Sequence, residues 1–248
     1  MVRKKVRNHI PGIITFINLF LGFVAVINIF KGNYVFACQC IMLGAILDSI
    51  DGKLARLFGI ASSFGAEIDS LADLISFCLV PSIFVYVLYT EGLPKFSGEI
   101  ISSIPLILGA IRLARFNTDS SNNISRSYFE GLPTPMNALA IVSIILFVNQ
   151  NPNYLDSKLL LPLIILISFM MITKVRYEKF PILNFNSGFK NTFKIIILFS
   201  FIIIFMIAYF YNCESWILII YASFYILSGM LAHVLFQNKR LKMIGENQ

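Results

Sequence analysis

Charged residues are scarce in this chain of 248 residues, where Asp, Glu, Lys and Arg together make up 13%. No polar stretch is long enough to bury a core of its own, which excludes a second, soluble domain. The four cysteines form no C-x-x-C pair and lie in or beside apolar stretches, so we expect reduced packing residues. The two histidines, His9 and His233, are isolated from other ligand types and predict no metal site.

Apolar residues dominate the chain instead, at 57% with a mean hydropathy of +0.78, as in a polytopic membrane protein. We predict one all-α integral membrane domain over residues 1–248, with catalytic helices within 13–190 and further C-terminal helices within 191–236. About eight stretches could cross, or nearly cross, a bilayer core of about 30 Å. They lie near 13–30, 35–57, 63–89, 99–115, 134–149, 157–173, 192–211 and 214–236, the fifth and sixth being short.

The basic N-terminus followed by an apolar run resembles a signal peptide only superficially. The run 13–30 is longer than a usual signal core, no small-x-small cleavage site follows, and the next helix begins at once. We therefore expect a retained first helix.

The distribution of basic residues predicts an orientation. If the N-terminus is on the cytoplasmic side of the membrane, 17 of the 20 Lys and Arg residues lie on that side. The opposite side keeps only Lys31, Lys95 and Lys158. Both termini are then cytoplasmic, and so is the acidic cluster described below. The net charge of +7 reflects this bias and favours anionic lipid headgroups. So apolar a chain argues against nucleic acid as the partner.

Four carboxylates stand out against this background: Asp48, Asp51, Asp69 and Asp73. A carboxylate at membrane depth costs about 2.5–3.5 kcal/mol, so each needs a partner or a task. The first two are spaced i, i+3 and the last two i, i+4, which places each pair on one helix face. Oxygen ligands favour Mg²⁺, Mn²⁺ or Ca²⁺, and four carboxylates suffice for two ions about 3.5–4 Å apart.

The residues around the aspartates complete a pattern. Gly52, Ala55 and Gly65 allow close approach of a ligand or helix, and Arg56 shares a face with Asp48 and could hold a phosphate. The pattern D-x2-D-G-x2-A-R-x8-G-x3-D-x3-D is complete here, and the chain resembles the CDP-alcohol phosphatidyltransferases.

The resemblance implies a phosphatidyl transfer from CDP-diacylglycerol to an alcohol, with release of CMP and dependence on Mg²⁺ or Mn²⁺. Ca²⁺ could bind in place of these ions. The first three aspartates would be metal ligands, and Asp73 the general base as well as a ligand. Gly52, Ala55, Arg56 and Gly65 would face the nucleotide and its diphosphate. Asn18, on the first helix, would lie near the cytidine, whereas Thr15 is expected to make a hydrogen bond between helices.

A second group of residues concerns the acceptor. Arg112-Leu-Ala-Arg115-Phe-Asn117 and Phe129-Glu130-Gly-Leu-Pro-Thr-Pro135 resemble the phosphatidylserine synthase branch of the family. The segment 176–180 is similar to that branch, with Pro181 where Lys is common. The resemblance implies L-serine as acceptor.

We expect Arg112, Arg115, Asn117 and Glu130 to bind the acceptor or the lipid phosphate. For either arginine, anchoring at a helix end is an equal alternative. Other acceptors, glycerol-3-phosphate or an inositol phosphate, stay open, as does a divalent-cation transporter. The resemblance also implies a homodimer.

Overall fold

The computed structural model describes residues 10–58, 63–94, 96–121, 128–152, 157–178 and 214–245. Its longer helices are α2 (Ile10–Phe30), α3 (Tyr34–Phe58), α4 (Ser63–Asp73), α5 (Val80–Tyr89), α6 (Ser97–Ser121), α7 (Thr134–Gln150), α8 (Leu161–Phe169) and α10 (Glu214–Gly245). Short elements join them: the π-helix η1 (Leu74–Leu79), the 3-10 turns η2 (Ser157–Leu160) and η3 (Met170–Ile172), and strands β1 (Tyr128–Glu130) and β2 (Arg176–Glu178).

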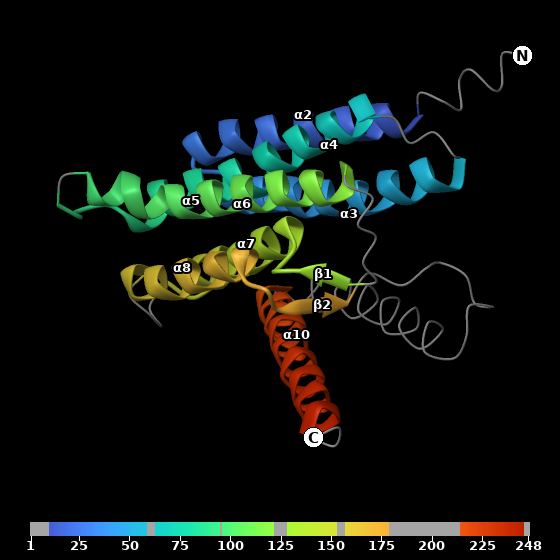
Figure 1. The fold of residues 1–248 in the computed structure, drawn as a ribbon. Coiled ribbons are helices and arrows are strands. Elements are labelled where there is room, and N and C mark those ends of the chain that lie inside the picture. The colour runs from blue at the N-terminus through green and yellow to red at the C-terminus, as the bar shows by residue number, and fades with distance from the viewer. Residues whose placement is uncertain are drawn as a thin grey trace, which may run out of the picture.

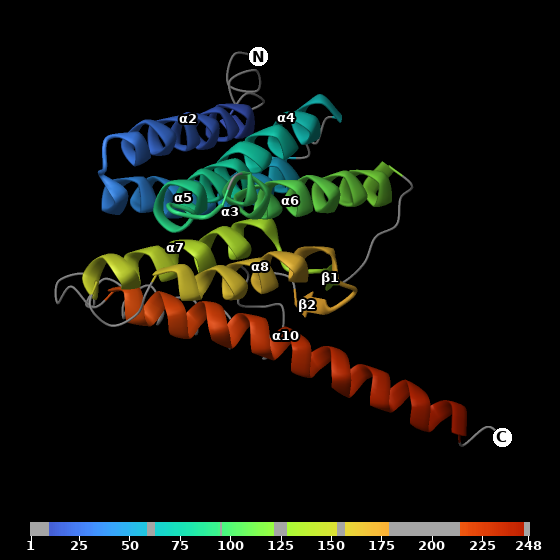
Figure 2. The ribbon, with the colours of Figure 1, turned by 90° about the vertical axis from the view of Figure 1, so that its left-hand side faces the viewer.

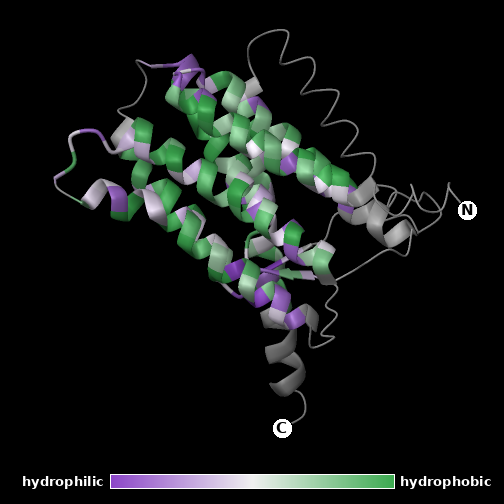
Figure 3. Ribbon diagram, turned by 90° about the horizontal axis from the view of Figure 1, so that it is seen from above, coloured by the Kyte–Doolittle hydropathy of each residue, from purple (hydrophilic) through white to green (hydrophobic). Residues whose placement is uncertain are grey.

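Within the described residues, five helical stretches are long and apolar enough to cross a membrane: Gly12–Phe30, Tyr34–Asp51, Phe64–Tyr89, Ser97–Asp119 and Ser215–Phe236. Two shorter apolar helices, Thr134–Gln150 and Leu161–Ile172, coincide with the fifth and sixth predicted spans. The predicted span near 192–211 lies outside the described residues. The prediction of a helical, polytopic membrane protein is confirmed, and hydrophobic residues run along most of the bundle (Figure 3).

The helices form layers (Figures 1 and 2). Helix α2 packs along α3, and α4, η1, α5 and α6 lie beside this pair. Helices α7 and α8 lie beneath them, and α10 runs under α7 and contacts β2. Most of the buried side chains between these helices are apolar. Large apolar side chains such as Phe20, Phe23 and Leu231 are exposed on the outside, as expected for a surface that faces lipid.

The third predicted span, near 63–89, is one continuous rod with a π-helical segment in its middle. In η1 the backbone N–H of Val80 donates to the carbonyl of Ile75, five residues back. Pro81 follows directly and has no N–H to donate, and its ring crowds the preceding turn. Widening the helix over η1 accommodates this proline, and π-helical turns recur at functional sites.

A small antiparallel sheet supplements the helices, and the sequence did not predict it. Tyr128 pairs with Glu178, Phe129 with Tyr177 and Glu130 with Arg176. Gly131 leaves β1 with φ +76°, and a Cβ there would collide with the carbonyl oxygen of Met171. The turn before α7 is therefore held against η3, which requires a glycine at position 131.

The sheet also fastens α10. Tyr177 stacks on Tyr225, with ring centroids 5.4 Å apart, and the Arg176 guanidinium lies between the rings of Tyr128 and Phe236. Gly229 leaves room for the Tyr177 ring. Burial raises the pKa of Tyr177 to about 12, so this phenol stays neutral at physiological pH.

Candidate metal and active site

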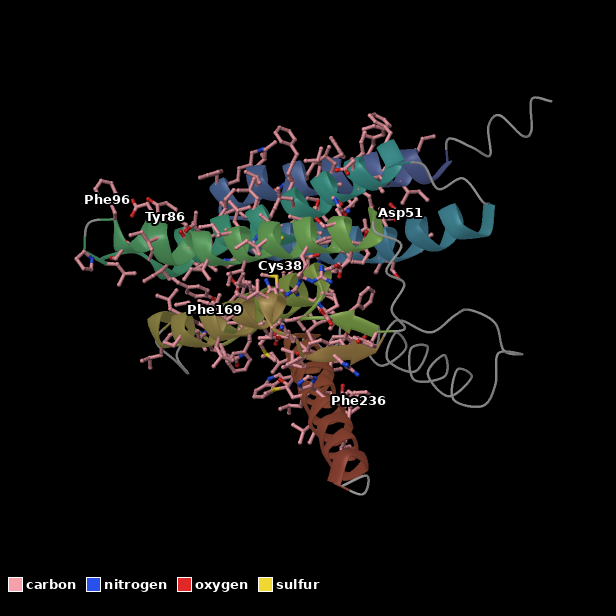
Figure 4. All side chains as sticks on the ribbon, viewed as in Figure 1. Cys38, Asp51, Tyr86, Phe96, Phe169 and Phe236 are labelled. Carbon is pink, nitrogen blue, oxygen red and sulfur yellow. The ribbon has the colours of Figure 1, made fainter. Side chains whose placement is uncertain are left out.

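Helices α3 and α4 bring three of the four predicted carboxylates together. One oxygen each from Asp48, Asp51 and Asp69 lies within 4.8 Å of the others. The sequence spacing explains part of this, because Asp48 and Asp51 share one face of α3. Asp69 comes from α4, which packs on α2. Asp51 lies toward the end of the bundle opposite Tyr86 and Phe96 (Figure 4).

Asp73 completes the cluster from the last turn of α4. Its carboxyl group interacts electrostatically with those of Asp48 and Asp69. Among the described residues, Oδ1 of Asp69 and Oδ1 of Asp73 have no hydrogen-bond partner although both atoms are buried. Buried oxygens without partners, in a donor set made only of carboxylates, fit a hard divalent cation.

A hydroxyl group on α2 supports one of these ligands. Thr15 Oγ1 donates a hydrogen bond of 3.0 Å to Asp51 Oδ2, and both residues are buried. The predicted bond between helices is present, but its acceptor is a candidate metal ligand. Thr15 therefore orients the Asp51 carboxylate from outside the cluster.

Asn18 lies one turn further along α2 and is completely buried. Its Oδ1 packs so closely on α3 that a Cβ at Gly44 would come within 2.7 Å of it. Its backbone carbonyl accepts a hydrogen bond from Ser76 in η1, and no described residue pairs with its side-chain amide. The side-chain amide therefore has a donor and an acceptor left for a ligand.

The remaining residues predicted for the diphosphate lie on α3 and α4, the helices that carry the aspartates. Gly52, Ala55 and Arg56 belong to the last turns of α3, and the side chains of Ala55 and Arg56 lie outside the described part of the chain. Gly65 is exposed near the start of α4.

Arg112 provides positive charge beside the aspartates. It is 7% exposed, and it interacts electrostatically with Asp48 and Asp73. Its Nη1 lies 3.4 Å from Thr134 Oγ1 at the start of α7. Among the described residues this one buried arginine does not balance four carboxylates, so the cluster fits bound cations.

The other predicted acceptor residues have structural partners. Arg115 donates to the backbone carbonyls of Ile172 (3.2 Å) and Glu130 (3.3 Å), so it ties α6 to the sheet and η3. Asn117 Oδ1 accepts a hydrogen bond of 3.1 Å from Ser70 on α4. Glu130 lies in β1 with its side chain half-buried.

Sequence reasoning missed one further residue, Asn137, which is completely buried in α7. Nothing in its apolar sequence context indicated a site, because an asparagine in a membrane helix more often joins two helices. Among the described residues, however, neither Nδ2 nor Oδ1 of Asn137 has a hydrogen-bond partner.

Comparison with known proteins agrees with this geometry. The family model described as CDP-alcohol phosphatidyltransferase matches residues 8–175. The chain is 36% identical over 180 residues to the CDP-diacylglycerol–serine O-phosphatidyltransferase of Helicobacter pylori, covering 71% of this chain and 74% of that protein. Enzymes of the same name from Methanocaldococcus jannaschii (34% over 169 residues, 68% and 73% covered) and Bacillus subtilis (32% over 173 residues, 70% and 92% covered) are also similar.

Proposed function

Because this chain belongs to the CDP-alcohol phosphatidyltransferase family, we propose that it is a CDP-diacylglycerol–serine O-phosphatidyltransferase. It transfers the phosphatidyl group of CDP-diacylglycerol to the hydroxyl of L-serine and releases CMP. The products are phosphatidylserine and CMP.

The observation that carries the proposal is the convergence of Asp48, Asp51 and Asp69, with the Asp73 carboxyl group interacting electrostatically with Asp48 and Asp69. We propose all four as ligands of Mg²⁺ or Mn²⁺. When bound, such ions neutralise the diphosphate and stabilise the negative charge that develops on the departing CMP. Thr15 holds Asp51 in place through its hydroxyl.

Asp73 is the proposed general base. Its carboxylate accepts the proton of the serine hydroxyl while that oxygen attacks the phosphorus bonded to diacylglycerol. A new P–O bond to serine forms, and the bond between that phosphorus and the CMP oxygen breaks. Arg112, electrostatically coupled to Asp73, provides a fixed positive charge on the acceptor side.

On the nucleotide side we propose Asn18 near the cytidine, and Gly52, Ala55, Arg56 and Gly65 along the diphosphate. The unpartnered amide of Asn18 supports this assignment. On the acceptor side, the bonds of Arg115 and Asn117 favour a positioning task for both. Glu130 holds the end of α6 through its carbonyl.

We further propose eight spans in a single membrane domain, with both termini and the aspartates at the cytoplasmic face, and a homodimer. The basic residues support the orientation. Cysteine-scanning with a membrane-impermeant reagent would test it.

The decisive experiment measures CMP release by purified protein with CDP-diacylglycerol and Mn²⁺ or Mg²⁺. Release that depends on L-serine and stops on chelation is expected. Release only with glycerol-3-phosphate or an inositol phosphate would change the acceptor. No release with any acceptor, together with Mn²⁺ flux into sealed vesicles, would indicate a transporter.

A further inference from the structure

We propose that the N-terminal turn of α7, with Arg112 and Asn137, binds the α-carboxylate of the serine acceptor. This inference rests on the proposed function and identifies where the acceptor lies within it. Three independent features of the described residues meet there: a helix N-terminus, a buried arginine and a buried amide.

The helix terminus is the first feature. Helix α7 runs for 17 residues from Thr134, and its N-cap residue, Pro133, makes no side-chain hydrogen bond to it. Thr134 is completely buried, so this end of the helix lies inside the protein. A helix N-terminus carries partial positive charge, and it is a favourable place for a carboxylate.

The buried arginine is the second feature. Arg112 Nη1 lies within 3.4 Å of Thr134 Oγ1, which brings the guanidinium to the first residue of α7. Its Nε is buried, and no described residue accepts a hydrogen bond from it. A guanidinium with an unused donor can bind a carboxylate through parallel hydrogen bonds.

The buried amide is the third feature. Asn137 follows Thr134 by three residues and therefore lies on the same face of α7. Its exposed fraction is 0%, and neither side-chain atom has a partner among the described residues. A buried amide without partners is costly to the fold, so its retention indicates a ligand.

The neighbouring charges fix the direction of the substrate. Arg112 interacts electrostatically with Asp48 and Asp73, so the proposed carboxylate-binding residues adjoin the acidic cluster. A serine held by its carboxylate then directs its hydroxyl and ammonium toward the aspartates. Among the described residues one arginine and one amide meet here, which suits a singly charged carboxylate better than a doubly charged phosphate and favours serine over glycerol-3-phosphate.

The test uses Asn137→Leu, a replacement of nearly equal size without polar atoms. The assay compares kcat/KM for L-serine with that for L-serinamide, which carries a neutral amide in place of the carboxylate. We expect the ratio of the two to fall about 10- to 100-fold, the range for a hydrogen bond to a charged group. Thermal stability without substrate should be unchanged or higher, because no native hydrogen bond is lost.

Ser143→Ala is the matched control, since Ser143 is also buried in α7 but donates to the carbonyl of Ala140. It should leave the ratio unchanged. An equal loss for both acceptors in Asn137→Leu, or an unchanged ratio, would overturn the proposal. If that variant does not fold, Asn137→Asp provides the same test. The negative charge at position 137 should lower kcat/KM for serine and leave kcat/KM for serinamide unchanged. An unaltered ratio of the two would again overturn the proposal. Wild-type protein inactive with serine would instead overturn the proposed function itself.

Discussion

Replacing Thr15 by valine removes a single hydroxyl group and keeps the shape of the side chain. In the native protein this hydroxyl donates a 3.0 Å hydrogen bond to Asp51 Oδ2 between two buried residues. Without it the Asp51 carboxylate keeps its charge but loses a bond that orients it. We therefore expect Thr15→Val to weaken the binding of Mn²⁺.

The magnitude follows from the type of contact. Loss of a group that orients a metal ligand typically costs about 10- to 100-fold in affinity. That range corresponds to about 1.4–2.8 kcal/mol, which matches a hydrogen bond to a charged group. Thr15→Ser retains the hydroxyl and should bind Mn²⁺ within a few-fold of the wild type.

Electron paramagnetic resonance of free Mn²⁺ measures the affinity directly, independently of turnover. Thr118→Val is a matched control, because Thr118 donates to the carbonyl of Ala114 on the exposed part of α6. Native Mn²⁺ affinity in a folded Thr15→Val protein would refute the reasoning, since Asp51 would then need no support from α2.

Four further outcomes are expected. Asp73→Asn should abolish CMP release while sparing CDP-diacylglycerol binding, and retained turnover would remove Asp73 as the base. Gly131→Ala should lower the free energy of unfolding by about 1–3 kcal/mol, measured as a lower Tm. Residue 131 has a φ of +76°, and a Cβ there would collide with a backbone carbonyl of η3. Gly12→Ala is the control and should leave the Tm unchanged, because nothing lies near its Cβ position. Arg115→Met should lower the Tm, because the Arg115 guanidinium donates to two backbone carbonyls. It should raise the KM for serine less than Arg112→Met does. An equal rise in KM for both variants would make Arg115 an acceptor ligand. Chelation with EDTA should stop CMP release until Mg²⁺ or Mn²⁺ is restored, and activity that survives chelation would contradict the metal site.

The aspartate cluster could be predicted from the sequence because its spacing is a property of the helix. Residues three or four apart on an apolar helix share a face wherever the helix lies, so Asp48 and Asp51 had to point together. That Asp69 on α4 meets them depends on the packing of α4 beside α2, which the spacing alone does not contain. The prediction of seven of the eight helical segments succeeded for a similar reason, since hydropathy alone marks helices in a bilayer.

Other features depend on contacts between distant segments, which a local pattern does not contain. Arg115 appears in the sequence as one of a pair of helix-end cations, yet its partners are carbonyls 15 and 57 residues away. The pairing of β1 with β2 joins two three-residue strands that are too short to show a strand pattern. Asn137 is informative only because its partners are missing, and only the packed structure reveals this.

The pairing of β1 with β2 has a consequence for biosynthesis. Residues 170–178 hold the entrance to α7: Leu132 donates to the Met170 carbonyl, Gly131 to that of Val175, and β1 pairs with β2. These later residues leave the ribosome only after α7 and α8 have been made, so a nascent chain that already carries the aspartates still lacks the support for its acceptor side. Assembly is therefore ordered in time, with the four aspartates translated first and the contacts that hold the start of α7 formed only after α8 has been made.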